Sequence, residues 1–325
     1  MSPLIQGMLT ILIGVGGCVG YFYASNLILD KVIFPTQAKN PGKNINRANM
    51  VRPWLFLFPA LAALGLYLVY PVVGSFYRSL FNRSGDEFIG FGNYTTMFGD
   101  DGFQTALLNN FLWVLVVPAS ATFLGLLVAQ LTDRLSWGNI AKSLIFMPMA
   151  ISFVGASLIW KFVYANNPDI GLINAIRDVF GAAPLDPLQL PFWNNFFLMF
   201  ILVWIQTGFA MVILSAALRG IPEETIEAAI IDGANPFQIF FKIKVPQIMG
   251  TIVVVWTTIT ILVLKVFDIV YTMTGGNFGT EILPSYMMAY MFRDDGRATA
   301  VAFVIMIIVL PVMIWNIRQA RQEMK

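Results

Sequence analysis

Long stretches without charged residues alternate with short polar segments along this chain. Seven stretches of about 18 residues or more contain no Asp, Glu, Lys or Arg: 1–29, 53–77, 102–132, 143–160, 188–218, 245–264 and 298–317. A helix of about 20 apolar residues crosses the hydrocarbon core of a bilayer. The stretches lack the alternation of a membrane barrel. The pattern therefore predicts an all-α integral membrane protein with about seven transmembrane helices, the sixth continuing to about Tyr271.

The first apolar stretch has two interpretations, a secretory signal peptide and a retained membrane helix. Residues 1–20 contain no Lys or Arg, so the positive region of a signal peptide is missing. No cleavage site of small residues precedes a soluble domain. We therefore expect a retained helix. Within the fourth stretch, Pro148 predicts a kink.

The distribution of Lys and Arg predicts the orientation, because cytoplasmic loops are enriched in both. The loop after the first helix has one acid and five basic residues, Lys31, Lys39, Lys43, Arg47 and Arg52. The next loop has two Arg and four acids. Alternation then places the N-terminus outside and the C-terminus in the cytoplasm. Predicted cytoplasmic segments, including Arg134 and Lys325, hold 13 Lys and Arg, against 6 in the external ones.

Composition excludes several classes of function. The chain is 58% hydrophobic and 12% charged, whereas soluble domains have about 25% charged residues. It contains no His and one Cys, Cys18, so the usual His and Cys metal sites and the Ser-His-Asp or Cys-His catalytic groups are not expected. A net charge of +2 does not suggest nucleic acid. The pair Gly42-Lys43 lacks the surrounding residues of a phosphate-binding P-loop, so we expect a non-catalytic chain.

A polar segment, 219–247, lies between the fifth and sixth apolar stretches. Its first part predicts a short helix to about Ile231, ended by Gly233, which favours the left-handed conformation of a helix C-cap. Asn235-Pro236 has the chemistry of an N-cap followed by a first helical residue. The second helix is expected to end at Pro246. These residues alone leave two interpretations open, an interfacial loop and a docking site for another protein.

The same segment resembles the EAA loop of ABC importer permeases. The matching residues are Glu227, Ala228, Ala229, Asp232, Gly233 and Ala234, then Phe240, Ile243 and Pro246. It departs from the family pattern at Val245, where Leu is more usual, and the later TMTGGNFG run has Asn277 where a third Gly often stands. Further stretches, among them SNLILDKVIFP and LPFWNNFFLM, look like the α-glucoside permeases of bacterial binding-protein-dependent importers.

The resemblance implies a six-helix permease core with one added N-terminal helix in a bacterial inner membrane. Residues 1–52 would form that helix and a basic cytoplasmic linker, and 53–325 the permease domain. The loop would be a coupling helix that inserts into an ATPase subunit, with Glu227 at the contact, Gly233 allowing the turn, and Phe237 and Phe240 packing against the permease. The implied partners are a second permease, two ATPases that bind ATP and Mg, an extracytoplasmic sugar-binding protein, and membrane lipid.

Candidate residues for a sugar pathway lie on three helices. Thr251, Thr258, Lys265 and Thr272 recur every seven residues, and Asp268 lies within pairing distance of Lys265 along a helix. Helix contacts, or charges reaching the interface, are the alternatives. The resemblance adds three residues, Gln206, Phe209 and Thr260. Asn109 and Asn110 are either pathway residues or a helix cap.

Two other readings of function are weighed against the importer. The first is an ion-gradient-driven secondary transporter in which Lys265 and Asp268 relay the ion, although no inverted repeat is visible. The second is an intramembrane enzyme, which the absence of His disfavours. The resemblance also leaves open whether the sugar site lies in this chain or in its partner permease. We expect ATP-driven alternating access.

Overall fold

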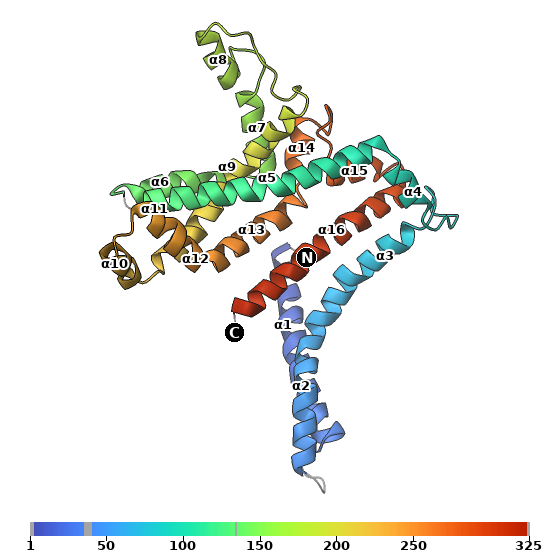
Figure 1. Cartoon of the computed structure of the whole chain (residues 1–325). Helices are drawn as coiled ribbons and strands as arrows, with labels where there is room; N and C mark the ends of the chain where they lie inside the picture. Colours follow the sequence, from blue (N-terminus) through green and yellow to red (C-terminus); the bar gives the residue numbers. More distant parts are fainter. Residues whose placement is uncertain (1–2, 36–40, 134, 324–325) are drawn as a thin grey trace. The chain divides into compact units, whose positions relative to one another are not determined.

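The computed structural model describes residues 3–35, 41–133 and 135–323 (Figure 1). In these ranges the backbone is helical or irregular, and the pairing of extended backbone is limited to an isolated bridge between Phe81 and Phe88. The all-α prediction is confirmed. Lys39, Arg134 and Lys325, which entered the charge count, lie outside the described residues.

The chain divides into two units, Met1–Gly74 and Ser75–Lys325. The first unit is a helical hairpin joined by a hydrogen bond from the Tyr21 hydroxyl to the Leu55 carbonyl at 2.9 Å. Arg52 forms an ion pair with Asp30 at 2.8 Å. Its elements are α1 (Pro3–Ile28), the π-helix η1 (Leu29–Ile33), α2 (Pro41–Leu64), the π-helix η2 (Gly65–Val69) and the beginning of α3 (Tyr70–Arg78). The division predicted between residues 52 and 53 stays a prediction.

The second unit contains the remaining helices, of which the α-helices are labelled in Figure 1. They are α4 (Gly92–Phe98), α5 (Asp101–Thr132), α6 (Gly138–Phe146), η3 (Met147–Ala150), α7 (Phe153–Val163), α8 (Leu172–Val179), α9 (Trp193–Arg219), α10 (Glu223–Ile231), α11 (Pro236–Gln238), η4 (Ile239–Lys244), α12 (Val245–Gln247), α13 (Met249–Val263), α14 (Asp268–Met273), α15 (Leu283–Tyr290) and α16 (Asp295–Glu323). Two long helices, α5 and α9, run alongside each other through its centre (Figure 1).

The seam between α5 and α9 is packed at backbone distance. A Cβ placed on Gly125 would lie 2.4 Å from the Ala210 Cβ and 2.8 Å from the Met211 nitrogen. A Cβ on Gly208 would lie 2.6 Å from the carbonyl oxygen of Ile145. Small residues let membrane helices approach closely and gain dispersion contacts. Gly125 and Gly208 therefore determine how close α9 comes to α5 and to the C-terminal end of α6.

Among the described residues, five helices are long and apolar enough to cross a membrane: Ile5–Ile33, Pro41–Arg78, Asp101–Thr132, Trp193–Arg219 and Asp295–Trp315. Two further spans would each be a bent pair of helices, which brings the number to seven. Gly138–Ala150 and Phe153–Val163 meet at 105°. The bend lies at Ser152, whose hydroxyl caps α7 by accepting from the Gly155 nitrogen at 3.1 Å, and Pro148 lies in the 3₁₀ turn before it.

The sixth predicted helix is interrupted. Pro236–Gln247 and Met249–Val263 meet at 70°, and α13 ends at Val263, short of the expected Tyr271. A new helix, α14, starts at Asp268, whose carboxylate suits the positive end of a helix. The break falls where the charge-free stretch ends, and Lys265 lies within it. The proposed face of Thr251, Thr258, Lys265 and Thr272 is therefore wrong, because one helix does not hold all four.

Candidate functional site

Helix α10 forms the first half of the predicted EAA segment and ends where the sequence indicated. Pro222 precedes it with an extended ψ of 132°, and Glu223 and Glu224 lie in its first turn. Carboxylates at this end interact favourably with the helix dipole. Glu227 and Ala228 are exposed, while Ala229 faces inward and is buried. One side of α10 is thus available to a partner.

Gly233 makes the turn between the two halves of the segment. Its φ is +79°, a conformation that costs a residue with a Cβ free energy. The Ala234 nitrogen donates to the Ala229 carbonyl at 2.9 Å, and the Gly233 nitrogen donates to Ile230 at 3.0 Å. These bonds satisfy carbonyls at the helix end. The predicted glycine C-cap is confirmed.

Asn235 begins the second half through a reciprocal capping box. Its Oδ1 accepts from the Gln238 nitrogen at 2.9 Å, and the Gln238 Oε1 accepts from the Asn235 nitrogen at 2.9 Å. Pro236 occupies the first turn, where its missing N–H is not needed. The N-cap prediction is confirmed. The expected helix end at Pro246 is confirmed to within one residue, since the π-helix Ile239–Lys244 leads into α12, which ends at Gln247 before the bend at Ile248.

The segment packs against the protein through Ile239, which is buried, and through Ile226 and Phe240, which are partly buried. Phe237 is 77% exposed and Ile231 is 85% exposed. The expected packing of Phe237 against the permease is therefore wrong, because the capping box turns that side chain outward and Ile239 inward. We use the term docking surface for the exposed residues Glu227, Ala228, Ile230, Ile231, Asp232 and Phe237.

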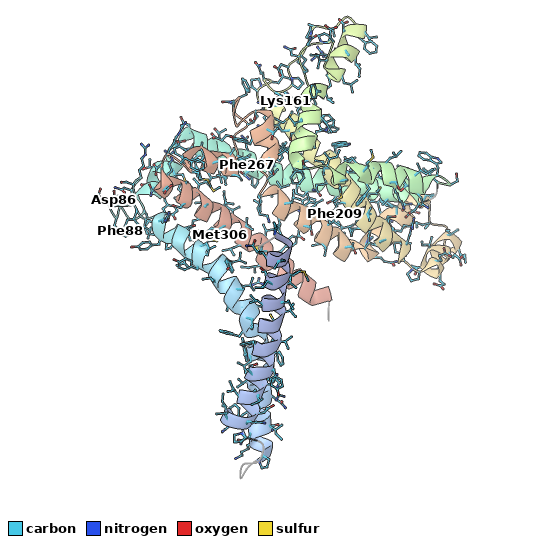
Figure 2. The ribbon with its side chains drawn as sticks, turned by 180° about the vertical axis from the view of Figure 1, so that it is seen from behind. Asp86, Phe88, Lys161, Phe209, Phe267 and Met306 are labelled. Atoms are coloured by element: carbon cyan, nitrogen blue, oxygen red, sulfur yellow. The ribbon has the colours of Figure 1, made fainter. Side chains whose placement is uncertain are left out.

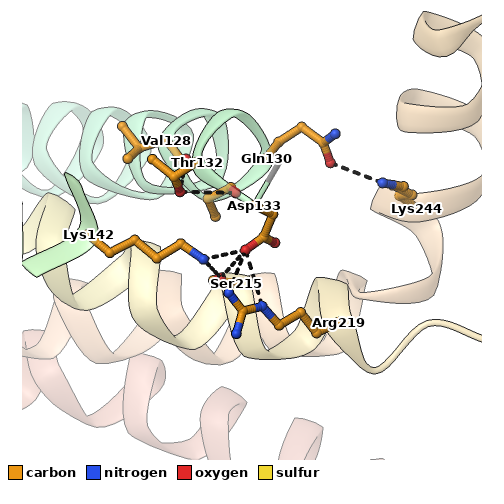
Figure 3. Close-up of polar contacts among 9 residues, drawn as sticks. Val128, Gln130, Thr132, Asp133, Lys142, Ser215, Arg219 and Lys244 are labelled. Carbon is orange, nitrogen blue, oxygen red and sulfur yellow. Dashed lines mark hydrogen bonds and ion pairs between the residues drawn. The ribbon is translucent and has the colours of Figure 1, made fainter. Parts of the chain in front are cut away.

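A cavity of ≈ 300 Å³ lies beside the segment. Its lining combines both halves of the segment with the end of α5: Gln130, Ile226, Ile230, Ala234, Pro236, Ile239, Phe240 and Lys244. The Lys244 Nζ donates to the Gln130 Oε1 at 3.3 Å across this space (Figure 3). The segment therefore rests on α5 as well as on the helices that precede and follow it.

A cluster of charged and polar side chains lies where α5, α6 and α9 come together (Figure 3). The Asp133 Oδ1 accepts from Lys142, from the Ser215 Oγ at 3.0 Å and from the Arg219 Nη2 at 3.0 Å. Burial works to raise the pKa of the Asp133 carboxyl, but the hydrogen bonds from Lys142, Ser215 and Arg219 outweigh burial and lower it. Asp133 is therefore held as a carboxylate.

The sequence interpretation missed this cluster, although it contained a signal. Asp133, Lys142 and Arg219 each stand directly at the end of an apolar stretch. The predicted topology puts these three ends on the same side of the membrane. Opposite charges at neighbouring helix ends favour an ion pair, so topology and charge together could have indicated it.

Asn109 and Asn110 lie inside α5, so the alternative that they cap a helix is wrong. The Asn109 Nδ2 donates to the carbonyls of Gly279 at 2.8 Å and Glu281 at 2.7 Å. The Asn110 Oδ1 accepts from the Leu283 nitrogen at 2.6 Å. Both side chains thus bind the backbone of the loop between α14 and α15, up to the first residue of α15.

Asn194 and Asn195, on α9, bind the same loop. The Asn194 Nδ2 donates to the Phe278 carbonyl at 2.7 Å. The Asn195 Nδ2 lies 3.3 Å from the Asn109 Oδ1 and 3.4 Å from the Gly279 carbonyl. Phe278 has a φ of 60°, which is uncommon for a residue with a bulky side chain. Asparagines from α5 and α9 thus hold one strained loop.

The remaining pathway candidates do not line one cavity. Gln206 and Thr260 are buried, and the Thr260 hydroxyl donates to the Trp256 carbonyl at 2.8 Å within its own helix. Lys265 lines a cavity of ≈ 330 Å³ with Phe267, Pro284, Met287, Met288, Ala302 and Ile305. Figure 2 shows Phe209 well away from Phe267. Lys265 and Asp268 form no ion pair within the described part of the chain, because the break before α14 separates them.

Comparison with known proteins decides the family. Residues 121–321 match the model described as "Binding-protein-dependent transport system inner membrane component". The chain belongs to this family. It is a multi-pass protein of the inner membrane and the non-catalytic permease subunit of an ABC importer, in which separate subunits hydrolyse ATP. The resemblance read from the EAA segment is confirmed, and the ion-gradient alternative receives no support.

Relatives extend the match beyond these residues. The chain is 61% identical to the alpha-glucoside transport system permease protein AglF of Rhizobium meliloti, covering 99% of both proteins. It is 49% identical to the osmoprotective compounds uptake permease protein GgtC of Synechocystis, over 83% of this chain and 99% of that protein. A solved bacterial ABC transporter involved in alginate import has the same fold, with a TM-score of 0.72 at 21% identity over 87% of this chain and 99% of that chain.

Proposed function

We propose that this chain is one half of the translocation pathway of an ATP-driven importer for an α-glucoside or a related disaccharide. The observation that carries the substrate class is the 61% identity, over 99% of both chains, to a permease named for alpha-glucoside transport. A second, homologous permease would complete the pathway. The exposed apolar surface that the chain leaves along its long helices is consistent with burial against such a subunit and against lipid.

Residues 219–247, which we call the coupling segment, would transmit the conformational changes of the ATPase cycle to the permease. Its docking surface offers a carboxylate, Glu227, beside small and apolar side chains, and such a surface can enter a cleft of another protein. The exposed Ala228 allows close approach of the partner, whereas Ala229 and Ala234 allow the segment to lie close to the permease, and Asp232 adds a second carboxylate next to the turn at Gly233. Phe240 and Pro246 shape the part that rests on the permease. Two ATPase subunits that bind ATP and Mg would dock here and on the partner permease.

Topology follows from the same proposal. The N-terminus would lie outside and the C-terminus in the cytoplasm, which places the coupling segment on the ATPase side. The distribution of Lys and Arg supports this orientation. A sugar-binding protein would then deliver substrate to the opposite face. A solved relative in fold, the alginate transporter, is described in complex with its pentasaccharide-bound periplasmic protein.

The substrate pathway would run along α9 and α13. Gln206 is a buried amide for which no hydrogen bond is found among the described residues, and Phe209 lies three residues further along the same helix. An amide and an aromatic ring are the groups that bind sugar hydroxyls and sugar faces. Thr260 would contribute from α13. Lys265 and Asp268 would lie at one end of this path. Asn109 and Asn110 are engaged with the loop, so we propose no direct sugar contact for them.

The test is to purify the chain from its host with its partners and to assay reconstituted vesicles. We expect an ATPase subunit to co-purify and uptake of α-linked disaccharides to require ATP and to be blocked by vanadate. Gln206→Ala should raise the sugar concentration needed for half-maximal uptake while leaving the complex assembled. Uptake that continues without an ATPase and is abolished by a protonophore would contradict the proposal.

A further inference from the structure

The last turn of α5 contacts both ends of the coupling segment. At the beginning of the segment, Arg219 donates to the Asp133 Oδ1 through Nε at 3.2 Å and Nη2 at 3.0 Å. Near its end, the Lys244 Nζ donates to the Gln130 Oε1 at 3.3 Å. Gln130 and Asp133 are three residues apart, so both contacts arise from one turn of one helix (Figure 3).

The Asp133 side of this contact is shielded from water. The side chains of Asp133 and Lys142 are 20% and 13% exposed, whereas Arg219 is 61% exposed. Ser215, which is buried on α9, bonds to both Asp133 and Lys142, with the Lys142 Nζ 2.5 Å from its Oγ. Charge-assisted hydrogen bonds are stronger than neutral ones, and removal of one partner from a shielded cluster leaves an uncompensated charge. The cluster thus couples α5, α6 and α9 at one point.

Between its two ends, the segment packs through apolar side chains, among them Ile226 and Phe240, which are partly buried. Ile239 and Ala229 are buried, and the cavity beneath them is lined by Gln130 as well. Because both ends of the segment contact the same turn of α5, we expect the segment and this turn to move together. Movement imposed on the docking surface would therefore reach α5 directly, and α5 is packed along α9 at backbone distance through Gly125.

We infer that Gln130 and Asp133 form a joint that transmits movement of the coupling segment to the packed helices α5 and α9. The inference rests on the proposed docking of an ATPase on that segment. Both are positioning residues, since neither belongs to the docking surface. In this arrangement Arg219 and Lys244 both connect the segment to the last turn of α5. A rotation of the segment about one of these contacts would break the other.

The chain offers a matched control. Arg52 and Asp30 form an ion pair at 2.8 Å in the other structural unit, with side chains 34% and 39% exposed. This pair resembles the Asp133 cluster in chemistry, and both of its residues lie outside the coupling segment and outside the unit that contains it. A general loss of charge pairing would affect both sites, whereas a loss of coupling would follow from the α5 site alone.

The experiment compares Asp133→Asn, Asp30→Asn and Gly233→Pro in the complete transporter, reconstituted with its partner subunits and binding protein. We measure co-purified ATPase, ATP hydrolysis and sugar uptake. Asp133→Asn should keep the ATPase bound but lower uptake per ATP hydrolysed by about fivefold or more, the range of a lost coupling interaction, and Asp30→Asn should leave that ratio unchanged. A normal ratio in Asp133→Asn overturns the inference. Retention of the ATPase by Gly233→Pro would instead count against the proposed docking.

A cross-linking experiment keeps the inference testable if Asp133→Asn does not assemble. In a Cys18→Ser background, Gln130→Cys with Lys244→Cys removes one half of the joint. Uptake per ATP should fall, and a short bifunctional thiol reagent that links the two cysteines should restore it, because the two positions move together. A cross-link that forms but stops uptake while the ATPase remains bound would show that α5 and the segment move apart, and would overturn the inference.

Discussion

Arg297 donates to the Asp100 Oδ2 through Nη2 at 2.6 Å and thereby joins the beginning of α16 to the N-cap of α5. The same guanidinium donates to the Tyr286 hydroxyl and lies 4.2 Å from the centroid of the Tyr290 ring. Cations gain electrostatic energy over the face of an aromatic ring. A carboxylate therefore stands at each end of α5, Asp100 at its beginning and Asp133 at its end, and each binds a cation from a distant part of the chain.

Asp100→Asn should destabilise the protein at neutral pH. Burial acts to raise the pKa of Asp100, but the Arg297 hydrogen bond and the Phe103 backbone N–H outweigh burial and lower it. A lowered pKa contributes stability above the ordinary value of 3.8, and this contribution is lost as pH falls through the lowered value. We expect a loss of about 1–2 kcal/mol, limited by partial exposure. Thermal unfolding in detergent should show the difference from wild type shrinking below that ordinary value.

Glu281→Gln should have the opposite effect. Burial, and then the neighbouring Asp100, raise the pKa of the Glu281 carboxyl. For a raised pKa the stabilising contribution is present below the ordinary value of 4.5 and is lost as pH rises through the raised value. The neutral amide should therefore raise the unfolding temperature at neutral pH and leave it unchanged in acid. A lower unfolding temperature at neutral pH would show that the Glu281 charge is favourably paired.

Gly233→Ala should weaken the turn without steric conflict. The φ of +79° disfavours a Cβ, although a Cβ there would meet no atom within 4 Å. The left-handed conformation costs such a residue about 1–2 kcal/mol. We expect weaker ATPase association in a pull-down titration with little loss of folded protein. Gly74→Ala, also in open space but inside α3, is the control and should not reduce association.

Gly125→Ala should force α5 and α9 apart, because the new Cβ would lie 2.4 Å from the Ala210 Cβ. Overpacking of this kind costs about 1–3 kcal/mol. Adding Ala210→Gly should recover only part of that loss, since the Met211 nitrogen would still lie 2.8 Å from the new atom. Unfolding temperatures of the single and double variants measure both effects. Full recovery in the double variant would show that the backbone of α9 yields at this point.

Local chemistry made the coupling segment predictable. The turn at Gly233 and the cap at Asn235 depend on residues within a few positions of each other, and both were found where the sequence indicated them. The break after Val263 was not predicted, although the charge-free stretch ends at residue 264, because Lys265 and Asp268 were interpreted as residues of one continuing helix. The Asp133 cluster and the asparagines were missed for another reason. Their partners lie up to 86 and 173 positions away. Topology and charge together could have indicated the Asp133 cluster, whereas the contacts of the asparagines with the loop depend on the packed fold alone.

The asparagines on α5 and α9 do for the loop between α14 and α15 what water does for a loop on the surface of a soluble protein. Their amides satisfy the backbone at Phe278, Gly279, Glu281 and Leu283. Without these amides, the backbone N–H and C=O groups of the loop would need water as their hydrogen-bond partner. Side chains thus take the place of water for this loop, and we expect its backbone to keep its conformation whether or not water or substrate fills the space beside it.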